Sequence, residues 1–539
     1  MTEELTESGF DPFLPQGACY IIFGRGILMV RWILASFPLF VLLFTMLRLK
    51  WKARNAGAVA WLVAILVGWV FFGGFPYLLA VASAKGISLT LFVVLIIWTS
   101  AFMYQMVSET GAVPIISRWM ASLSSDRLML GLLVAWCLTG VIQAVAGYGV
   151  PVAVCAPLMI AAGFEPVMAA AATLVGHAWA VTFGSMGSSY YTLTLSTKIP
   201  GEILGNWVGV TFIIPTILTG LAVAHIIEGW AGVRRGFVRI VVAGSAMGTI
   251  QWLVARAGSG QVAALLGSLG GVALVVLMSP WGHGEKRATG KEISLHLALV
   301  PYYALLVLTL ISQIGPVKLF FKPYKIGLDY PAMKTAQGYS VVAEKAYAAI
   351  GLFSHPAPII AMACVTGLVV YVVKGLLKTS NLKRAARATA RQSWQTTLGV
   401  LTMVMMALVM TDTGMTKEMA TGVAGTAGVL FPVVSPFIGV LGCFMTGSNT
   451  NANILFGAFQ TETAKALGIS STLIAGAQTV GASLGSSIAP AKVLLGSSTS
   501  GLTGREDELL KKCLPYCLVI VLALGIQTLL ATWALAVTP

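Results

Sequence analysis

The amino-acid sequence predicts an all-α polytopic membrane protein with about 12 to 14 transmembrane helices, and three observations point to this class. Hydrophobic residues make up 57% of the 539 positions, charged residues only 10%, and the mean hydropathy is +0.87. Soluble domains carry roughly 25% charged residues, so this chain must present most of its outside to lipid. Apolar runs of about 20 residues, the length that crosses a bilayer, recur along the chain, and Lys and Arg gather between them.

The apolar runs give the expected spans in chain order. The acidic segment before the first run lacks the basic region and short apolar core of a cleavable signal, so none is expected. We expect spans near Ile27–Leu47, Ala58–Phe75, Leu89–Met106, Leu128–Ala146, Ala169–Phe183, Val208–Ile227, Ile240–Ala257, Ala263–Met278, Leu295–Ile314, Pro358–Val373, Thr396–Met410, Val423–Met445, Leu473–Ile488 and Leu514–Trp533.

Basic clusters in the loops orient the chain, because Lys and Arg beside a span favour the cytoplasmic side. Placing the clusters in the cytoplasm makes the N-terminus external and leaves the crossing count open. The formal charge of +15 is then a topology signal and not the footprint of a nucleic-acid partner. The clusters are Arg48, Lys50, Lys52 and Arg54; Arg118 and Arg127; Arg234, Arg235 and Arg239; Lys286, Arg287 and Lys291; Lys374, Lys378, Lys383, Arg384, Arg387 and Arg391; and Arg505, Lys511 and Lys512.

The largest polar stretch, Pro316–His355, falls on the outside under this orientation although it carries lysines. Two interpretations are open. The segment is a solvated cap, or its lysines draw anions toward an external mouth. The chain then divides into five parts: an external N-terminal segment (1–26), a first half with a hairpin near 147–163 (27–227), connecting helices with the external loop (228–355), a second half with a hairpin near 447–468 (356–489), and a C-terminal segment with the last helix (490–539).

The two halves share a series of short motifs about 300 residues apart. Each half has an acidic residue followed by Thr-Gly at the end of a span, then Thr-Gly, a helix-breaking polar or glycine-rich segment, a single glycine and a Val-Gly pair. The first series is Glu109-Thr110-Gly111, Thr139-Gly140, Ala146–Pro151, Gly163 and Val175-Gly176-His177. The second series is Asp412-Thr413-Gly414, Thr446-Gly447, Ser448–Asn453, Gly468 and Val480-Gly481-Ala482.

The paired breaks have a physical interpretation. Backbone that leaves the helix inside a bilayer must find partners in protein or water. Breaks at corresponding points of two halves therefore predict two inverted repeats whose re-entrant hairpins meet near the middle of the membrane. Helix N-termini exposed there offer N–H groups and a positive dipole end, which favour an anion.

The chain resembles the L-lactate permease family over nearly its whole length. The resemblance is densest in AGYGVPVAVCAPLMIAAGFEPVMAAAATL (146–174), FPVVSPFIGVLGCFMTGSNTNANILFGAFQ (431–460) and GLTGREDELLKK (501–512). It implies secondary transport of lactate and glycolate, usually with protons. It also implies an elevator-type carrier, since the family is similar to ion transporters thought to work by an elevator motion.

Some residues depart from the usual family pattern. Gln143 stands where the family has glutamate, Tyr148 stands where it has phenylalanine, and Asn449 follows Ser448 where the family has aspartate. The lysine of a family motif is displaced to Lys492, after Ser487 and Pro490. The expected site is thus more positive than the family pattern. A Na⁺-coupled carrier of a dicarboxylate or a sulfonate therefore stays open beside a proton-coupled carrier of a monocarboxylate.

The candidate substrate-binding residues follow from the breaks and the resemblance. A charge inside a membrane segment indicates function, although Lys492 could also extend to an interface. Ser448, Asn449 and Thr450 resemble the hairpin tip of sodium/dicarboxylate symporters, which makes them candidate Na⁺ ligands, but the same residues suit a helix N-cap. The candidates are Gln143, Gly147, Tyr148, Gly149, Ser448, Asn449, Thr450, Asn451, Ser486, Ser487 and Lys492, with Ser185 and Ser188 as generic donors.

Three residues are candidates for proton coupling. His177 lies within a span, where it relays protons or serves as a neutral core residue. Glu109 and Asp412 occupy matching positions of the two series. Both lie near span ends, where a carboxylate is solvated at little cost, which favours a structural role over proton coupling.

Other classes of protein are disfavoured. Seven cysteines lie mostly in apolar runs without metal-ligand spacing, which predicts neither disulfides nor a metal site. Five histidines and no GxxxxGK[ST] motif argue against a membrane enzyme and against ATP-driven transport. An anion channel remains the alternative from another class. We expect an inner-membrane symporter without a cofactor, and a homodimer by analogy with elevator carriers.

Overall fold

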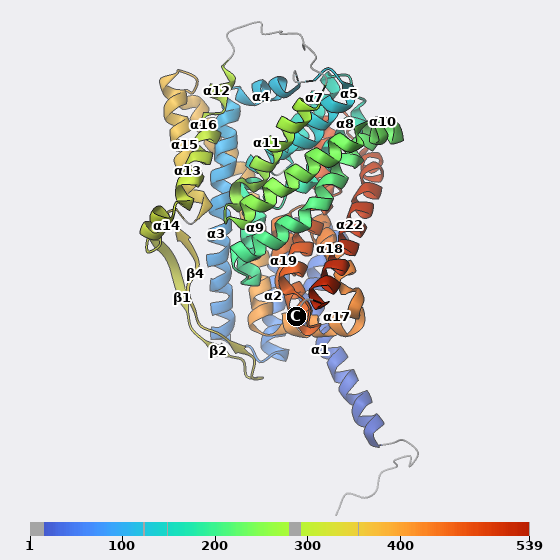
Figure 1. Cartoon of the computed structure of the whole chain (residues 1–539). Helices are drawn as coiled ribbons and strands as arrows, with labels where there is room; N and C mark the ends of the chain where they lie inside the picture. Colours follow the sequence, from blue (N-terminus) through green and yellow to red (C-terminus); the bar gives the residue numbers. More distant parts are fainter. Residues whose placement is uncertain (1–15, 122–123, 148, 280–292, 354, 538–539) are drawn as a thin grey trace, which may run out of the picture.

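The computed structural model describes residues 16–121, 124–147, 149–279, 293–353 and 355–537. The chain forms a long helical bundle from which the first helix projects at one end (Figure 1). The helices of the first part are α1 Gln16–Leu47, α2 Ala53–Phe71, α3 Pro76–Glu109, α4 Ala112–Ala121, α5 Arg127–Leu132, the π-helix η1 Leu133–Leu138, α6 Thr139–Val145, α7 Val150–Ala161, α8 Pro166–Gly176, the 3₁₀ turn η2 Ala178–Ala180, α9 Gly184–Thr197, α10 Gly201–Arg256 and α11 Gly260–Leu277.

The second part continues with short helices, four strands and a further series of long helices. These elements are α12 Leu295–Ala298, α13 Val300–Gln313, α14 Gly315–Phe321, β1 Lys325–Tyr330, β2 Met333–Lys334, β3 Ser340–Val341, β4 Glu344–Gly351, α15 Pro356–Val373, α16 Thr379–Asp412, α17 Met415–Ala427, the 3₁₀ turn η3 Gly428–Leu430, α18 Phe431–Thr446, α19 Asn449–Ala466, α20 Ser471–Gly485, α21 Pro490–Thr499 and α22 Glu506–Val537.

The part of the chain that the structure describes has ten helices long and apolar enough to cross a membrane, or up to twelve if each of two bent pairs is one span. Polytopic membrane architecture is therefore confirmed, but the expected 12 to 14 crossings meet this range only at twelve. One of these elements, α10, is itself a pair of helices, because its backbone leaves helical geometry at Glu228 and Gly229, where φ is −134° and +61°. The parts before and after this break pack in antiparallel order, since a Cβ on Gly209 would lie 2.6 Å from Trp252 and a Cβ on Gly244 would lie 3.0 Å from Ile217. The predicted spans Val208–Ile227 and Ile240–Ala257 are therefore the two arms of a helical hairpin.

The polar segment Pro316–His355, expected to be a solvated cap, contains the four β-strands of the described residues. The prediction of an all-α chain missed these strands. β1 and β4 form an antiparallel ladder in which Lys325 pairs with Gly351 and Tyr330 with Glu344. β2 and β3 form a second short ladder, with Met333 opposite Val341. Both ladders lie along the lower flank of the bundle beside α3 (Figure 1).

The distribution of side chains is that of a protein in lipid. Large apolar side chains face outward, as at Trp69 (57% exposed) and Val519 (66% exposed), whereas Thr, Ser, Asn and Gln side chains are buried. Small residues bring helices close together. A Cβ on Gly86 would lie 2.8 Å from Met405 of α16, so α3 and α16 approach too closely for a larger side chain.

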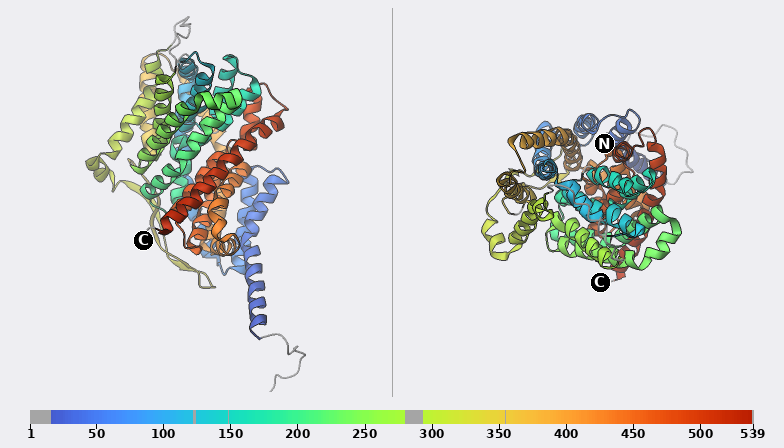
Figure 2. Two further views of the ribbon diagram at one scale, coloured as in Figure 1. Left: turned by 45° about the vertical axis from the view of Figure 1, so that its right-hand side comes forward. Right: turned by 90° about the horizontal axis from the view of Figure 1, so that it is seen from above.

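Two blocks of helices make up the bundle. In one block α16 packs along α2 and α3, and α15 packs against α3 and α13. In the other, α10 packs on α11 and α20, and α18 packs on α20 and α22. Figure 2 shows α13 at the periphery of the bundle, on the side opposite α22. Contacts of α9 with α3 and of α19 with α16 join the blocks, so α9 and α19 lie at the junction.

Candidate functional site

The helix breaks expected from the sequence are present in both halves. After α6 ends, Gly147 and Gly149 adopt φ of +54° and +84°, and α7 begins at Val150. After α18 ends, Gly447 adopts φ of +70° and Ser448 caps α19, its Oγ accepting from the N–H of Asn451 at 3.3 Å. Only glycine adopts such φ values readily, which explains the glycines at these breaks. Tyr148 lies outside the described residues.

A second pair of breaks follows two helices further on. Between α8 and α9 the chain runs through His177 to Phe183, and Ser185, Met186 and Gly187 all adopt positive φ. Between α20 and α21 it runs through Ser486 to Ala489. Non-glycine residues with positive φ are strained, and such strain clusters at functional sites. The predicted span at Ala169–Phe183 is therefore a broken pair, with α8 and α9 bent by 49° at the break.

The breaks of the two halves converge on the first turn of α21. A Cβ on Gly447 would lie 3.5 Å from Ala491, and a Cβ on Gly149 would lie 2.6 Å from Leu495 and 3.9 Å from Cγ of Lys492. A Cβ on Gly147 would overlap the hydroxyl of Ser185. The starts of α7, α9, α19 and α21 are thus neighbours in the interior.

Lys492 and His177 meet at this junction. The Lys492 Nζ lies 3.3 Å from Nε2 of His177, and the Ser486 Oγ lies 3.4 Å from the same atom. Nδ1 of His177 lies 3.0 Å from the carbonyl oxygen of Thr173. All of these side chains are buried. Within the described residues no ion pair includes Lys492, so the positive charge of this buried lysine has no carboxylate partner there.

Asn449 forms the centre of a second polar cluster. Its amide Nδ2 donates to Oγ1 of Thr182 at 2.9 Å, and its Oδ1 accepts from Thr479 at 3.4 Å. Asn453 donates to Oγ1 of Thr479 at 2.8 Å and to the Ser189 carbonyl at 3.0 Å. Thr450 Oγ1 lies 2.9 Å from the hydroxyl of Ser189. These bonds join α19 and α20 to the break before α9 and to α9 itself, and thus join the two halves of the chain.

Several buried acceptors in this region have no partner within the described residues. They are Oε1 of Gln143 and Oδ1 of Asn451 and Asn453. The Gln143 amide also lies at the break before α9, since a Cβ on Gly184 would lie 2.5 Å from its Nε2. A buried polar atom without a partner is costly, so each of these atoms can accept a hydrogen bond from a guest or from water.

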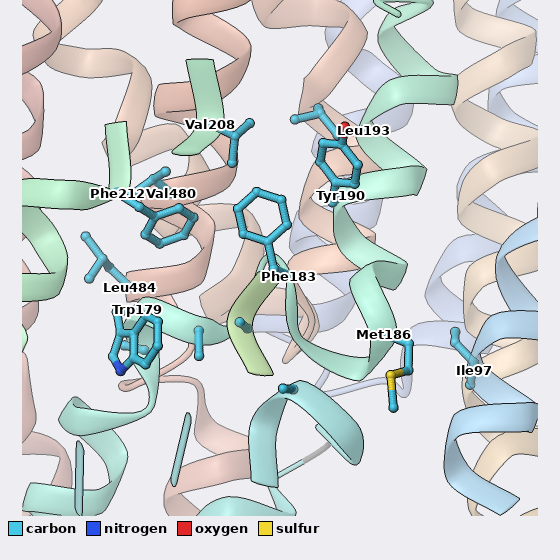
Figure 3. Close-up of a cluster of buried hydrophobic side chains, with 14 of the residues drawn as sticks. Ile97, Trp179, Phe183, Met186, Tyr190, Leu193, Val208, Phe212, Val480 and Leu484 are labelled. Atoms are coloured by element: carbon cyan, nitrogen blue, oxygen red, sulfur yellow. The ribbon is translucent and has the colours of Figure 1, made fainter. Parts of the chain in front are cut away.

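Figure 3 shows the apolar packing beside the cluster. The ring of Phe183 lies between Tyr190 and Phe212, with centroids 5.2 Å and 6.2 Å away. Val480 and Leu484 of α20 lie near Trp179 and Phe212 in the same view. This packing holds the break between α8 and α9 in place. Among the serine candidates, Ser487 donates to the Leu484 carbonyl at 2.7 Å and the Ser188 carbonyl accepts from Thr192 at 2.7 Å, both within the local backbone.

Glu109 and Asp412 lie in different environments, and in the part of the chain that the structure describes their polar partners are other residues than His177 and Lys492. Glu109 is 23% exposed and pairs with Arg384 at 2.8 Å. Asp412 is not solvated as expected. It is only 3% exposed and pairs at 2.9 Å with Lys85, a lysine of α3 that is itself 1% exposed. Both charges are buried away from water. The ion pair therefore replaces the solvation that each charge loses.

The ladder of β1 and β4 completes this ion pair. Glu344 of β4 lies 3.5 Å from Lys85 and also pairs with Lys198 at the end of α9. The ring of Tyr347 lies 5.6 Å from the Lys85 ammonium, and burial raises the pKa of the Tyr347 hydroxyl, so that group stays neutral. The polar segment therefore contributes an acidic side chain to a buried ion pair. Neither of the two interpretations made from the sequence, a solvated cap or an attractor of anions, included this contact.

Sequence reasoning missed Lys85, Thr182, Ser189, Asn453 and Thr479. Lys85 had a signal, because it is a charge within the long apolar run of α3. The threonines and serines had none, because such residues are common in membrane helices and each has a partner in the other half of the chain, as for Ser189 and Thr450, which are 261 positions apart.

Fold and site together define a multi-pass membrane protein with a positively charged interior site bounded by broken helices. The L-lactate permease family model matches residues 31–535, and the chain belongs to the L-lactate permease family. The family consists of permeases, which are transporters and not enzymes. The resemblance stated from the sequence is confirmed.

The chain is similar to several curated permeases. It is 26% identical over 531 residues to the L-lactate permease of Escherichia coli (strain K12), covering 93% of this chain and 96% of that protein. It is 25% identical over 544 residues to the glycolate permease GlcA of the same strain, covering 93% and 95%. It is 25% identical over 472 residues to the L-lactate permease of Bacillus subtilis (strain 168), covering 81% and 84%. These identities make it a divergent member.

Two solved transporter structures are distantly similar. The YdaH transporter of Alcanivorax borkumensis gives a TM-score of 0.46 at 15% identity, covering 83% of this chain and 86% of that chain. The MtrF protein of Neisseria gonorrhoeae gives a TM-score of 0.33 at 13% identity, covering 87% and 83%. These TM-scores are too low to define a shared fold.

Proposed function

We propose that this protein is a secondary active transporter of small organic anions, a symporter of a monocarboxylate such as lactate or glycolate, coupled to H⁺. The observation that carries the proposal is the buried Lys492 ammonium, which has no carboxylate partner within the described residues and lies beside Gly149 and Ala491 at the helix breaks. A buried charge is unfavourable without a partner. A small anion supplies the partner that the chain itself lacks there.

The proposed binding mode uses the broken helices. The substrate carboxylate pairs with Lys492 and accepts hydrogen bonds from backbone N–H groups at the starts of α7, α19 and α21. The helix dipoles favour negative charge at these positions. Gln143 and Asn451 retain free acceptor atoms, which suit the hydroxyl of a 2-hydroxy acid. The curated permeases that the chain resembles are named for lactate and glycolate, which are both 2-hydroxy acids.

The proposed mechanism treats the two halves as inverted repeats with two re-entrant hairpins. α7 and α8 turn at Gly163, and α19 and α20 turn at Gly468; both glycines have positive φ. α7 and α8 lie toward the upper end of Figure 1 and α19 toward the lower end, which supports hairpins entering from opposite sides. In an elevator motion, the block that holds these hairpins carries the site past the block of α2, α3, α15 and α16. We further propose an inner-membrane location with an external N-terminus, and a homodimer.

Counterflow into liposomes tests the proposal. Vesicles preloaded with unlabelled L-lactate or glycolate should take up labelled substrate transiently, and uptake should saturate with concentration. Flux that rises linearly with concentration and shows no counterflow would instead indicate an anion channel. Lys492→Met should abolish counterflow. Lys465→Met is the matched control, because Lys465 is an exposed lysine of the same half that pairs with Glu462 at the end of α19.

Sodium coupling with a dicarboxylate or a sulfonate is the second candidate. It is favoured by the cluster of buried oxygen atoms around Asn449, Thr182 and Thr479, because Na⁺, like other hard cations, is bound by oxygen ligands. Vesicles with an imposed sodium gradient at equal pH on both sides separate the candidates. Accumulation of succinate or a small sulfonate under that gradient supports sodium coupling, whereas accumulation of lactate only under a pH gradient supports proton coupling.

A further inference from the structure

The hydrogen bonds around His177 fix the position of its proton. Nδ1 faces the Thr173 carbonyl at 3.0 Å, and a carbonyl can only accept a hydrogen bond. The ring hydrogen therefore sits on Nδ1, and Nε2 is an acceptor. The two groups that face Nε2, the Ser486 hydroxyl at 3.4 Å and the Lys492 ammonium at 3.3 Å, can both donate. These contacts thus place a neutral imidazole against a cationic lysine.

The elements packed around this pair supply no counter-charge within the described residues. The titratable groups closest to Lys492 besides His177 include the thiol of Cys443 on α18, and the other thiols on packed elements are Cys137, Cys155, Cys513 and Cys517. The carboxylates on these elements lie at helix ends. Glu165 caps α8, Glu202 is in the first turn of α10, Glu228 pairs with Arg235, Glu506 bonds Ser497, Asp507 pairs with Lys511, and Glu508 pairs with Arg505.

A second proton on this pair is therefore unfavourable while the site is empty. Protonation of Nε2 would place an imidazolium beside an ammonium at the present 3.3 Å separation. Two unit charges about 4 Å apart repel by about 4 kcal/mol at an effective dielectric constant of 20. A bound carboxylate changes this balance, because it attracts the ammonium away from Nε2 and offsets one positive charge.

We infer that His177 Nε2 accepts the coupling proton only when an anion holds Lys492, so that anion and proton load together. The inference rests on the proposed function and names the residues that couple the two fluxes. The proton comes from water on the side to which the site is open and returns to water when the anion leaves. The empty pair carries one positive charge, and the loaded site carries ammonium, imidazolium and one carboxylate, which also sum to one positive charge. Transport of a monocarboxylate is then electroneutral.

Transport in proteoliposomes tests the inference. For the wild type, a pH gradient of one unit, alkaline inside, should drive up to about tenfold accumulation of labelled L-lactate, and an inside-negative potential set with potassium and valinomycin should leave the rate unchanged. His177→Gln should retain counterflow but lose accumulation driven by the pH gradient, and an inside-negative potential should now slow uptake, because the anion moves alone. His225→Gln is the matched control, since His225 contacts Tyr516 outside the cluster.

The outcomes separate the inference from the proposed function. Wild type without counterflow contradicts the proposed function itself. Counterflow without any response to the pH gradient contradicts the proton coupling of the proposed function and, with it, the inference. Accumulation by His177→Gln that equals that of the wild type overturns only the inference. If His177→Gln gives no counterflow, proton uptake by the wild type decides. Addition of lactate to the purified protein at pH 7 in weak buffer should take up about one proton per bound anion, and the absence of proton uptake overturns the inference.

Discussion

The Lys492 ammonium lies 3.3 Å from Nε2 of His177, although the two residues are 315 positions apart in the chain. His177 follows α8 of the first half and Lys492 lies in the first turn of α21 of the second half. The contact exists because each half breaks its helix at this depth, which brings both break segments to one point. The candidate anion site is therefore shared between the halves and needs both for its geometry.

Replacement of Lys492 should weaken the binding of all anions alike. Hydrogen bonds to charged groups contribute roughly 1.5–3 kcal/mol, so Lys492→Met should weaken binding of lactate, glycolate and acetate by about tenfold to a hundredfold. Ligand-induced thermal stabilisation of the purified protein measures this, because a ligand that binds only the folded state stabilises it in proportion to its affinity. Lys465→Met should bind as the wild type does. Selective loss of one anion would contradict a role as a general point charge.

Asn449→Ala should remove ligand-induced stabilisation. The variant loses the donor to Thr182 and the acceptor for Thr479 and leaves both hydroxyls of this buried cluster short of a partner, at a cost of about 1–3 kcal/mol per group. The thermal shift with lactate measures the effect. Asn206→Ala is the control, because Asn206 bonds Trp252 outside the cluster. A full thermal shift in Asn449→Ala would refute the assignment of this cluster to the site.

The glycine breaks should differ in their tolerance of alanine. Gly149 and Gly163 have nearly equal φ, +84° and +88°, but a Cβ on Gly149 meets Leu495 at 2.6 Å, whereas nothing lies within 4 Å of a Cβ on Gly163. Gly163→Ala should cost only the backbone strain of about 1–2 kcal/mol. Gly149→Ala should cost more and lower counterflow, because α21 must shift. Equal melting temperatures and equal transport for the two variants would contradict the convergence on α21.

The matching acids Glu109 and Asp412 should differ in their effect on stability. Asp412→Asn leaves the buried Lys85 with only Glu344 at 3.5 Å, and loss of one partner of a buried pair costs about 3–5 kcal/mol. Glu109→Gln removes a pair with the exposed Arg384, and such pairs contribute about 0–1 kcal/mol. Thermal unfolding in detergent compares the two. A similar small loss for both variants would show that Lys85 and Asp412 are solvated in the folded protein.

Some of this architecture could be predicted from the sequence. The breaks at Gly147 to Gly149 and at Gly447 to Ser448 were located because glycine runs and Ser-Asn segments inside apolar runs cannot continue a helix facing lipid. The two helices of α10 were predicted as separate spans because the charges at Arg234 and Arg235 divide two apolar runs. Their close antiparallel packing, as of Gly209 on Trp252, could not be seen from the sequence. The ladders of β1 to β4 were missed because a polar, lysine-bearing segment is also typical of a solvated loop.

The candidate site was predicted in part for the same physical reasons. His177, Asn449 and Lys492 stood out as polar or charged residues in apolar surroundings. Their mutual arrangement could not be predicted, since it depends on how α8, α19 and α21 pack, and Thr182 and Thr479 acquire their roles only through that packing. Lys85 would have been found by the rule that a charge within a membrane span needs a partner.

A structure determined by electron cryo-microscopy with L-lactate or glycolate bound tests the central claim most directly. A carboxylate oxygen should lie about 2.7–2.9 Å from the Lys492 Nζ, among the starts of α7, α19 and α21, with Nζ drawn away from Nε2 of His177. An anion bound elsewhere in the bundle, with the contact between Lys492 and His177 unchanged, would contradict the account.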